Sequence, residues 1–300
     1  PAGGRTGDNC LLATKVLVPI AGPVREGVGL LGSPSFEIPR TVQRDHRFDH
    51  LSSGPELKRR LAAKNRHNAG TMGLYLLVRY LYLVGVALAA IWTFGSGNLS
   101  GWAATSAAVV LGLAFTVGYF VLVERTVTGF RALQPRYCSI YQAPFWRHER
   151  YWKVNSNPYQ HIFDGTPFKG LLWRLLGVRI GRRVFDDGCA IVERTLVSVG
   201  DDCTLGTGSI VQSHSLEDGT FKSDHIAIGA GCTIGTGAFL LYGATMGDGS
   251  VLDTDSFLMK GERVPPGTRW GGNPATEITA AAAPADLRSR GRTDAPRLAA

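Results

Sequence analysis

The sequence predicts a mainly β protein: a parallel β-helix that is preceded by a two-helix transmembrane hairpin. Two observations carry this prediction. A large aliphatic residue recurs every six positions near the C-terminus, and two apolar runs of membrane-spanning length lie in the N-terminal half. A helix needs apolar spacings of three and four, and a single antiparallel strand needs two, whereas three hexads can close one triangular coil. The aliphatic positions are Ile228, Ile234, Leu240, Met246, Leu252 and Leu258, and small residues follow at Cys232, Ala238, Ala244, Ser250 and Ser256.

This pattern resembles the hexapeptide repeat of left-handed β-helix acyltransferases, and the resemblance implies a left-handed coil. We expect the domain over residues 178–278, entered through a short amphipathic helix at 167–177 that ends at a glycine cap. Val199, Leu205 and Val211 keep the period of six. Residues 212–225 have no hexad pattern, so we expect them to project from a corner of the coil.

Composition narrows the possible partners. The 300 residues allow roughly two domains, and the net charge of +8 favours nucleic acid, anionic lipid or an acidic or phosphorylated substrate. Much of the charge flanks the apolar runs, which favours lipid and makes nucleic acid an unexpected partner. Cys203 and Cys232 occupy small-residue positions of the hexads, so we interpret them as reduced core residues.

The N-terminal segment 1–40 contains a repeat of the last part of the β-helix. Residues 27–38 and 267–278 share Gly, Gly, Pro, Glu and Ile at identical offsets. We therefore expect residues 1–40 to be the tail of a preceding β-helix domain whose other coils lie upstream. A lone loop with a coincidental match is the alternative.

Residues 41–71 form a predicted basic cytoplasmic linker, with a short helix near 51–63, and residues 72–123 form the hairpin. Met72–Phe94 and Trp102–Val123 are each long enough to cross a hydrocarbon core of about 30 Å. Two buried helices of a soluble protein are the alternative. Because Lys and Arg flank the hairpin and are missing from its connecting loop, the positive-inside rule places both flanks and the β-helix in the cytoplasm.

Two further segments complete the predicted domain organisation. Residues 124–177 are interpreted as a juxtamembrane segment, in which the aromatic and basic residues of 145–153 favour a lipid interface over a nucleic-acid site. The remaining 279–300 form an expected disordered tail.

The predicted active site lies in the interruption of the repeat. His214 opens this loop and is the candidate general base, while Glu217 and Asp218 are candidates to orient its ring or hold a cationic amine. A hydrogen-bonded surface histidine is the alternative. We expect no metal, because a zinc site needs three or four ligands and the coils offer only two histidines. Candidate substrate-binding residues are Ser213, Ser215, Lys222, Asp224 and His225, and weaker candidates lie at His161 and 164–166.

Two β-helical pieces joined through a membrane hairpin resemble the C-terminal region of ε-poly-lysine synthetase-type non-ribosomal peptide synthetases. The matching motifs lie at residues 29–40, 136–138, 145–150, 165–168, 212–219 and 256–261. The resemblance implies adenylation and carrier domains upstream, tandem β-helices that form a pseudo-trimer, and a multi-pass protein of the bacterial inner membrane. It also implies that a carrier-linked phosphopantetheine thioester delivers an aminoacyl group to an amine of an amino acid or growing chain.

Two alternatives remain open. One is a membrane-anchored acyltransferase that uses acyl-CoA to modify a hydroxyl or an amine. The other is a non-catalytic β-helix scaffold that docks carrier domains. The hexad pattern and the apolar runs are compatible with all three functions.

Overall fold

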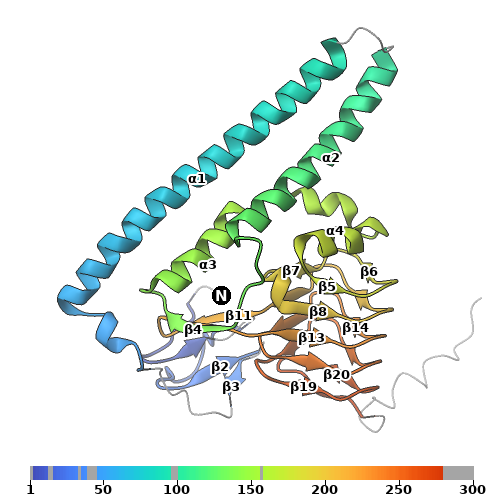
Figure 1. Cartoon of the computed structure of the whole chain (residues 1–300). Coiled ribbons are helices and arrows are strands. Elements are labelled where there is room, and N and C mark those ends of the chain that lie inside the picture. Colours follow the sequence, from blue (N-terminus) through green and yellow to red (C-terminus); the bar gives the residue numbers. More distant parts are fainter. Residues whose placement is uncertain are drawn as a thin grey trace, which may run out of the picture.

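The computed structural model describes residues 3–12, 16–32, 35–38, 46–95, 101–155 and 158–279. The expected tail lies outside the described residues except for Thr279, and so do residues 41–45 of the expected linker and most of the hairpin loop. A β-helix occupies one end of the molecule and a long helical hairpin rises from it (Figure 1). The predicted fold class is therefore confirmed.

The β-helix has three parallel sheets, one on each face of its coils. Each strand pairs with the strands of the coils above and below it. The first face contains β5 (Arg179–Ile180), β8 (Val197–Val199), β13 (Ile226–Ile228), β16 (Thr245–Met246) and β19 (Arg263–Val264). The second face contains β6 (Phe185–Asp186), β9 (Thr204–Leu205), β14 (Thr233–Ile234), β17 (Val251–Leu252), β20 (Arg269–Gly271) and the antiparallel β21 (Thr276–Glu277). The third face contains β7 (Ala190–Ile191), β10 (Ile210–Gln212), β15 (Phe239–Leu241) and β18 (Phe257–Leu258).

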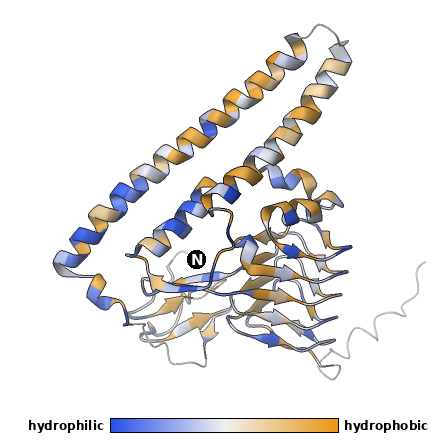
Figure 2. Cartoon of the chain, in the orientation of Figure 1, coloured by the Kyte–Doolittle hydropathy of each residue, from blue (hydrophilic) through white to orange (hydrophobic). Residues whose placement is uncertain are grey.

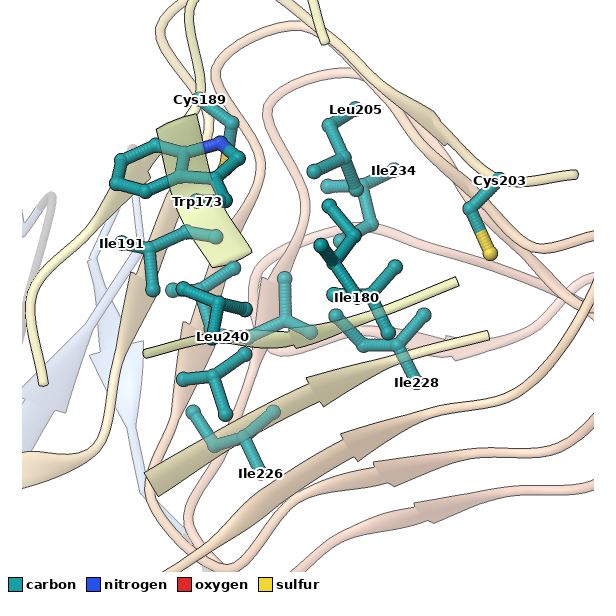
Figure 3. Packing of buried hydrophobic residues seen from close by; sticks show 14 of the residues in the cluster. Trp173, Ile180, Cys189, Ile191, Cys203, Leu205, Ile226, Ile228, Ile234 and Leu240 are labelled. Carbon is teal, nitrogen blue, oxygen red and sulfur yellow. The ribbon is translucent and has the colours of Figure 1, made fainter. Parts of the chain in front are cut away.

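The strand register confirms that three hexads make one coil. Ile228 pairs with Met246, and Ile234 pairs with Leu252, so each partner lies three hexads further along the chain. The aliphatic side chains of successive coils stack inside the prism, as Figure 3 shows for Leu205 and Ile234. The core is thus a ladder of one large residue per face and coil, except that the buried Asp186 occupies the Leu205 position of the first coil.

Glycine is required where neighbouring coils approach each other closely. A Cβ atom on Gly235 would collide with the backbone nitrogen of Thr254 in the next coil. Gly231 has φ of +67°, a left-handed conformation that favours glycine. These positions explain why glycines accompany the hexads.

The interruption of the repeat is a β-hairpin that leaves the third face. It consists of β11 (His214–Glu217) and β12 (Thr220–Ser223), and β4 (Arg136–Ser139) adds a third antiparallel strand. Because the register pairs Ile228 with Val199, this one coil contains the whole hairpin and is longer than a regular coil. The sequence predicts the projection but not the strand that β4 contributes.

Two helices long and apolar enough to cross a membrane form the hairpin, α1 (Gly54–Gly95) and α2 (Gly101–Val127). Figure 2 shows that hydrophobic residues dominate its distal part, whereas α1 carries its hydrophilic residues toward the other end. The expected short helix at 51–63 is wrong: after η1 (Asp49–Leu51), the basic segment belongs to one continuous helix of 42 residues.

The basic start of α1 is ordered by contacts with α3 (Ala143–Val154). Arg150 Nε donates to Thr71 Oγ1 over 3.0 Å, and His67 Nε2 lies 3.1 Å from the carbonyl oxygen of Trp146. Two aromatic residues of α3, Phe145 and Trp146, are buried in a cluster with Phe221. The expectation that these aromatics face lipid is therefore wrong, since they pack against the projecting β-sheet.

Two short helices, η2 (Pro158–Phe163) and α4 (Phe168–Leu176), lead into the first coil, and a third, η3 (Arg194–Leu196), lies at the end of that coil between β7 and β8. The predicted helix and its cap are confirmed, because α4 ends at Gly177 with φ of +102°. Leu172, Trp173 and Leu176 of α4 close the top of the β-helix core.

The N-terminal residues reproduce the end of the β-helix in three dimensions. β1 (Leu11–Leu12), β2 (Gly29–Leu31) and β3 (Phe36–Glu37) pair parallel and then antiparallel, as β17, β20 and β21 do. Leu11 pairs with Gly29 just as Val251 pairs with Arg269, so the two registers are identical. Leu31 is completely buried against aromatic residues of the third face, Phe239 and Phe257.

Candidate functional site

His214 lies where the chain leaves the third face to form the projecting hairpin. It is the first residue of β11, two positions after β10 ends, and its side chain is 13% exposed. Its ring packs 4.5 Å from the Trp152 ring and 5.8 Å from the Phe221 ring, measured between centroids. The site is thus bounded by the β-helix corner, the hairpin and α3.

A buried carboxylate, Glu193, holds this histidine. Glu193 is fully buried in the first coil, and its Oε1 lies 2.7 Å from Nδ1 of His214, within ion-pair distance although the ring is not aligned for an ideal hydrogen bond. Trp152 Nε1 donates to the same oxygen over 2.8 Å, and the backbone N–H of Ser213 donates to Oε2 over 2.9 Å. His148 Nε2 lies 3.4 Å from Oε1. Four groups from two parts of the chain, α3 and residues 213–214, therefore converge on one carboxylate.

Glu193 is ionised at neutral pH despite its burial. Burial alone would raise its pKa, but hydrogen bonds and charge from His148 and His214 outweigh that effect and lower the pKa to about 2. A carboxylate beside Nδ1 favours the tautomer that carries its proton there, which leaves Nε2 of His214 as the proton-accepting nitrogen. This arrangement suits a general base.

The structure places Glu217 and Asp218 at the far end of the hairpin from His214. Side chains alternate along β11, so Glu217 points to the opposite side from His214, about 10 Å further along the strand. Its carboxylate oxygens lie 2.9 and 2.8 Å from Nζ of Lys260. Asp218 occupies the turn with φ of +51°. The orienting carboxylate at the His214 ring is Glu193.

The five candidate substrate-binding residues divide into two groups. Ser213 and Ser215 are buried beside His214, and Ser213 supplies the N–H that fixes Glu193. Lys222 lies further along the hairpin, 4.0 Å from Glu217 and 5.4 Å from the centre of the Tyr137 ring.

Asp224 and His225 are exposed at the base of the hairpin, where Asp224 N–H donates to the Ser213 carbonyl over 3.1 Å. The structure therefore brings only the two serines together with His214.

A pocket of about 490 Å³ lies beside the site, between α3, η2 and β7. Trp152 lines this pocket and also contacts His214. The weaker candidate His161 lines it as well, and its Nδ1 lies 2.9 Å from Asp164, which also pairs with the buried Lys169. Burial favours a higher pKa for Asp164, but Lys169 and His161 lower it overall.

Glu193, His148 and Trp152 are not among the residues that the sequence predicts for the site. A signal for Glu193 was present, because counting the period of six back from Val199 reaches this acidic residue at a position where an aliphatic one is expected. His148 and Trp152 are four residues apart on one side of α3, which is visible only once α3 is placed against the hairpin. Within the described part of the chain, no group of three or more His, Cys, Asp or Glu residues is arranged to hold a metal ion.

A second buried polar cluster ties the helical hairpin to the same coil. Glu124, near the C-terminal end of α2, forms an ion pair with Arg194, the residue that follows Glu193. The Tyr151 hydroxyl of α3 donates to Glu124 over 3.0 Å. The C-terminal end of α2 is therefore bonded to Arg194, the sequence neighbour of the Glu193 carboxylate that holds His214.

Comparisons with known proteins agree with the fold. The family model described as the hexapeptide repeat of succinyl-transferase matches residues 196–220 and 225–258. The gap between these matches falls in the projecting hairpin. The predicted hexapeptide-repeat acyltransferase-like domain is therefore confirmed.

A curated relative is the delta-poly-L-ornithine synthetase of Acinetobacter baumannii (strain AB307-0294), which is 28% identical over 279 residues. The match covers 89% of this chain and 20% of the relative, so the chain spans about one fifth of that protein's length. A poly-amino-acid synthetase is the class of protein that the sequence resembles, and this prediction is confirmed.

Solved acetyltransferase structures are also similar to the chain. The acetyltransferase VCA0836 of Vibrio cholerae O1 biovar eltor, in complex with acetyl coenzyme A, is 20% identical, covering 57% of this chain and 88% of its own, with a TM-score of 0.34. Serine acetyltransferase of Brucella abortus strain S19 is 15% identical, covering 78% of this chain and 81% of its own, with a TM-score of 0.29.

Proposed function

We propose that this chain forms amide bonds by transferring an acyl group from a thioester to an amine, with His214 as the general base and Glu193 as the residue that positions it. The observation that carries this proposal is the buried Glu193 carboxylate 2.7 Å from His214 Nδ1, at the main interruption of the hexapeptide repeat. A buried acid costs stability unless it is bonded. Four groups satisfy this one, which supports a role in holding the histidine.

The proposed reaction is an aminolysis. The amine nitrogen attacks the thioester carbonyl carbon, a C–N bond forms, and Nε2 of His214 accepts the proton that the nitrogen loses. When the C–S bond breaks, the departing sulfur takes that proton from the imidazolium. Glu193 balances the positive charge on the ring between the two proton transfers. The reaction needs no oxidant or reductant.

The substrate class follows from the relative. Because the relative is a poly-L-ornithine synthetase, we propose that the acyl group is an aminoacyl group and that the acceptor is an amino acid or a growing chain. The donor would be a carrier-linked phosphopantetheine thioester supplied by upstream adenylation and carrier domains. Acyl-CoA as the donor is the alternative, and the two differ in whether ATP and an amino acid suffice for product formation.

We also propose that the hairpin crosses the bacterial inner membrane with the β-helix on the cytoplasmic side. Its two helices have 18-residue windows of mean hydropathy 2.0 and 2.2, of which only 6% and 11% of the residues are buried within the protein. The N-terminal part of α1, which precedes the apolar run, carries basic residues and docks on α3. This basic part therefore lies on the same side of the proposed membrane as the β-helix, as the positive-inside rule expects.

A preceding β-helix would complete the site. The segment before the hairpin repeats the register of the last strands of the β-helix and packs by Leu31 on the lower coils of the third face. A full β-helix on this face would bring its upper coils to β7, β10 and the corner at His214. We therefore propose tandem β-helices side by side, with acyl transfer at their interface.

The test uses the complete polypeptide that carries this chain, in membranes, with ATP and single amino acids. Mass spectrometry would follow oligomeric amides and, separately, aminoacyl loading of the carrier. We expect His214→Ala to abolish the amides without changing loading. His225→Ala is the matched control, because His225 is an exposed histidine at the base of the same hairpin.

Each result has a defined meaning. Loss of product in His214→Ala alone supports the proposal. Undiminished product in His214→Ala contradicts it and favours a scaffold that docks carrier domains. Product that requires acyl-CoA, with no carrier loading in any variant, contradicts the carrier-linked donor and favours the CoA-dependent alternative.

A further inference from the structure

We propose that α4 and the adjoining residue Ile162 form a membrane-contact surface that lays the top of the β-helix on the inner leaflet of the bilayer. This inference rests on the proposal that the hairpin spans the membrane. It concerns a part of the molecule outside the acyl-transfer site. The exposure, position and charge of the surface favour lipid as its occupant.

α4 is apolar on both of its sides. Leu172, Trp173 and Leu176 are buried against the first coil and α2. Phe168, Leu171 and Leu175 form the outward side at positions i, i+3 and i+7, and they are 64%, 52% and 43% exposed. Only the inward side packs on the fold, so the outward side is free to contact a partner outside the described chain.

Neighbouring residues enlarge this apolar surface. Ile162 of η2 is 63% exposed, and Leu122 on α2 is 55% exposed. Figure 2 shows hydrophobic residues both on α2 and on the helices beside it. A surface that lies against a membrane-spanning helix meets lipid first, because the bilayer surrounds that helix.

The position of α4 along α2 matches the lipid boundary. Arg125 Nε of α2 donates to the carbonyl oxygen of Leu175 over 3.1 Å. The ring of Tyr159, in η2, stacks 5.6 Å from the ring of Phe120 on α2. The apolar run of α2 ends at Val123, so both contacts fall within about one helical turn of the boundary that the sequence predicts.

Charge near this surface suits anionic headgroups. Arg131, Arg174 and Arg179 are exposed around α2, α4 and the first strand of the coil. Arginines beside apolar side chains at the cytoplasmic surface attract anionic lipid. The combination of an apolar strip and a basic rim is typical of helices that lie in the membrane interface.

The test places a photo-crosslinking amino acid, benzoylphenylalanine, at single positions of the full-length chain in nanodiscs that contain an anionic lipid. The positions are Leu171 on α4, Val110 in the middle of α2 and Thr254 on an exposed corner of a lower coil. All three side chains are exposed, so the substitutions preserve the core. Mass spectrometry of digests would count lipid and protein adducts.

We expect lipid adducts at Leu171 and Val110, both at least about tenfold above Thr254, because interfacial helices bury their apolar side at the acyl boundary. Lipid adducts at Val110 without adducts at Leu171 would overturn this inference and leave the spanning hairpin intact. Protein adducts at Leu171 would overturn it as well, by showing that a protein segment covers α4. Adducts missing at Val110 would contradict the spanning hairpin itself.

Discussion

Replacing Glu193 by Gln tests the link between the buried carboxylate and the reaction. The substitution keeps the size and the acceptor oxygen of the side chain but removes its charge. The pKa of Glu193 falls from an ordinary value of 4.5 to about 2. That difference corresponds to roughly 3 kcal/mol in favour of the ionised carboxylate in the folded protein.

The sign of the effect on stability follows from this pKa. A carboxyl group with a lowered folded-state pKa stabilises the fold above its unfolded value of 4.5, and the contribution is lost as the pH falls toward 2. At pH 7 we therefore expect Glu193→Gln to lower the free energy of unfolding by up to about 3 kcal/mol. Between pH 4.5 and 2 the difference between the two proteins should shrink.

The effect on activity should be larger than the effect on stability. A carboxamide carries no charge and no longer stabilises the charged ring of His214, so amide formation should fall by about 10²- to 10⁴-fold. Melting temperature against pH gives the stability, and product formation under conditions where both proteins are folded gives the activity. Wild-type activity in Glu193→Gln, together with an inactive His214→Ala, would refute the role of the carboxylate in the reaction. A difference in melting temperature between wild type and Glu193→Gln that stays constant below pH 4.5 would refute its role in stability.

Three further predictions concern the fold. Leu31→Ala should lower the unfolding free energy of the N-terminal segment by about 2–5 kcal/mol, since Leu31 is fully buried, and limited proteolysis should then cleave this segment first; wild-type resistance would contradict its docking. Gly235→Ala should lower the melting temperature, because its Cβ would collide with the backbone of the next coil, whereas Gly73→Ala, with open space around it, should not; equal melting temperatures would contradict the close stacking of coils. Glu124→Gln should destabilise the protein by about 3–5 kcal/mol, because it leaves Arg194 buried without its charge partner. Adding Arg194→Met to the same chain should recover part of this loss in thermal unfolding, whereas additive losses would show that the pair is not coupled.

The repeat made the β-helix predictable from local sequence. Each hexad places one of its own residues in the interior. The buried positions therefore recur at a fixed period and can be predicted without knowing any distant contact. Ile228, Ile234 and Leu240 are all buried, as the period requires. The apolar runs of the hairpin were equally visible, since length and hydropathy are properties of the segment alone.

The place of the candidate site was also predictable from the sequence, because the six-residue period is lost where the chain leaves the coil. His214 lies at that point. The roles of the residues near His214 in the sequence were not predictable in this way. Glu217 lies on the same short strand as His214, yet strand alternation turns it to the other side of β11 and toward Lys260.

Only the tertiary structure decided what surrounds His214. Glu193 belongs to the preceding coil, and coil stacking brings it to the ring because β10, which leads into the hairpin, pairs with β7. His148 and Trp152 come from α3, whose aromatic and basic composition suited a lipid surface and whose position depends on the antiparallel pairing of β4 with β12. The sequence determined the elements and the point of interruption because both depend on local periodicity, whereas the charged contacts depend on how distant segments dock, which no local pattern records.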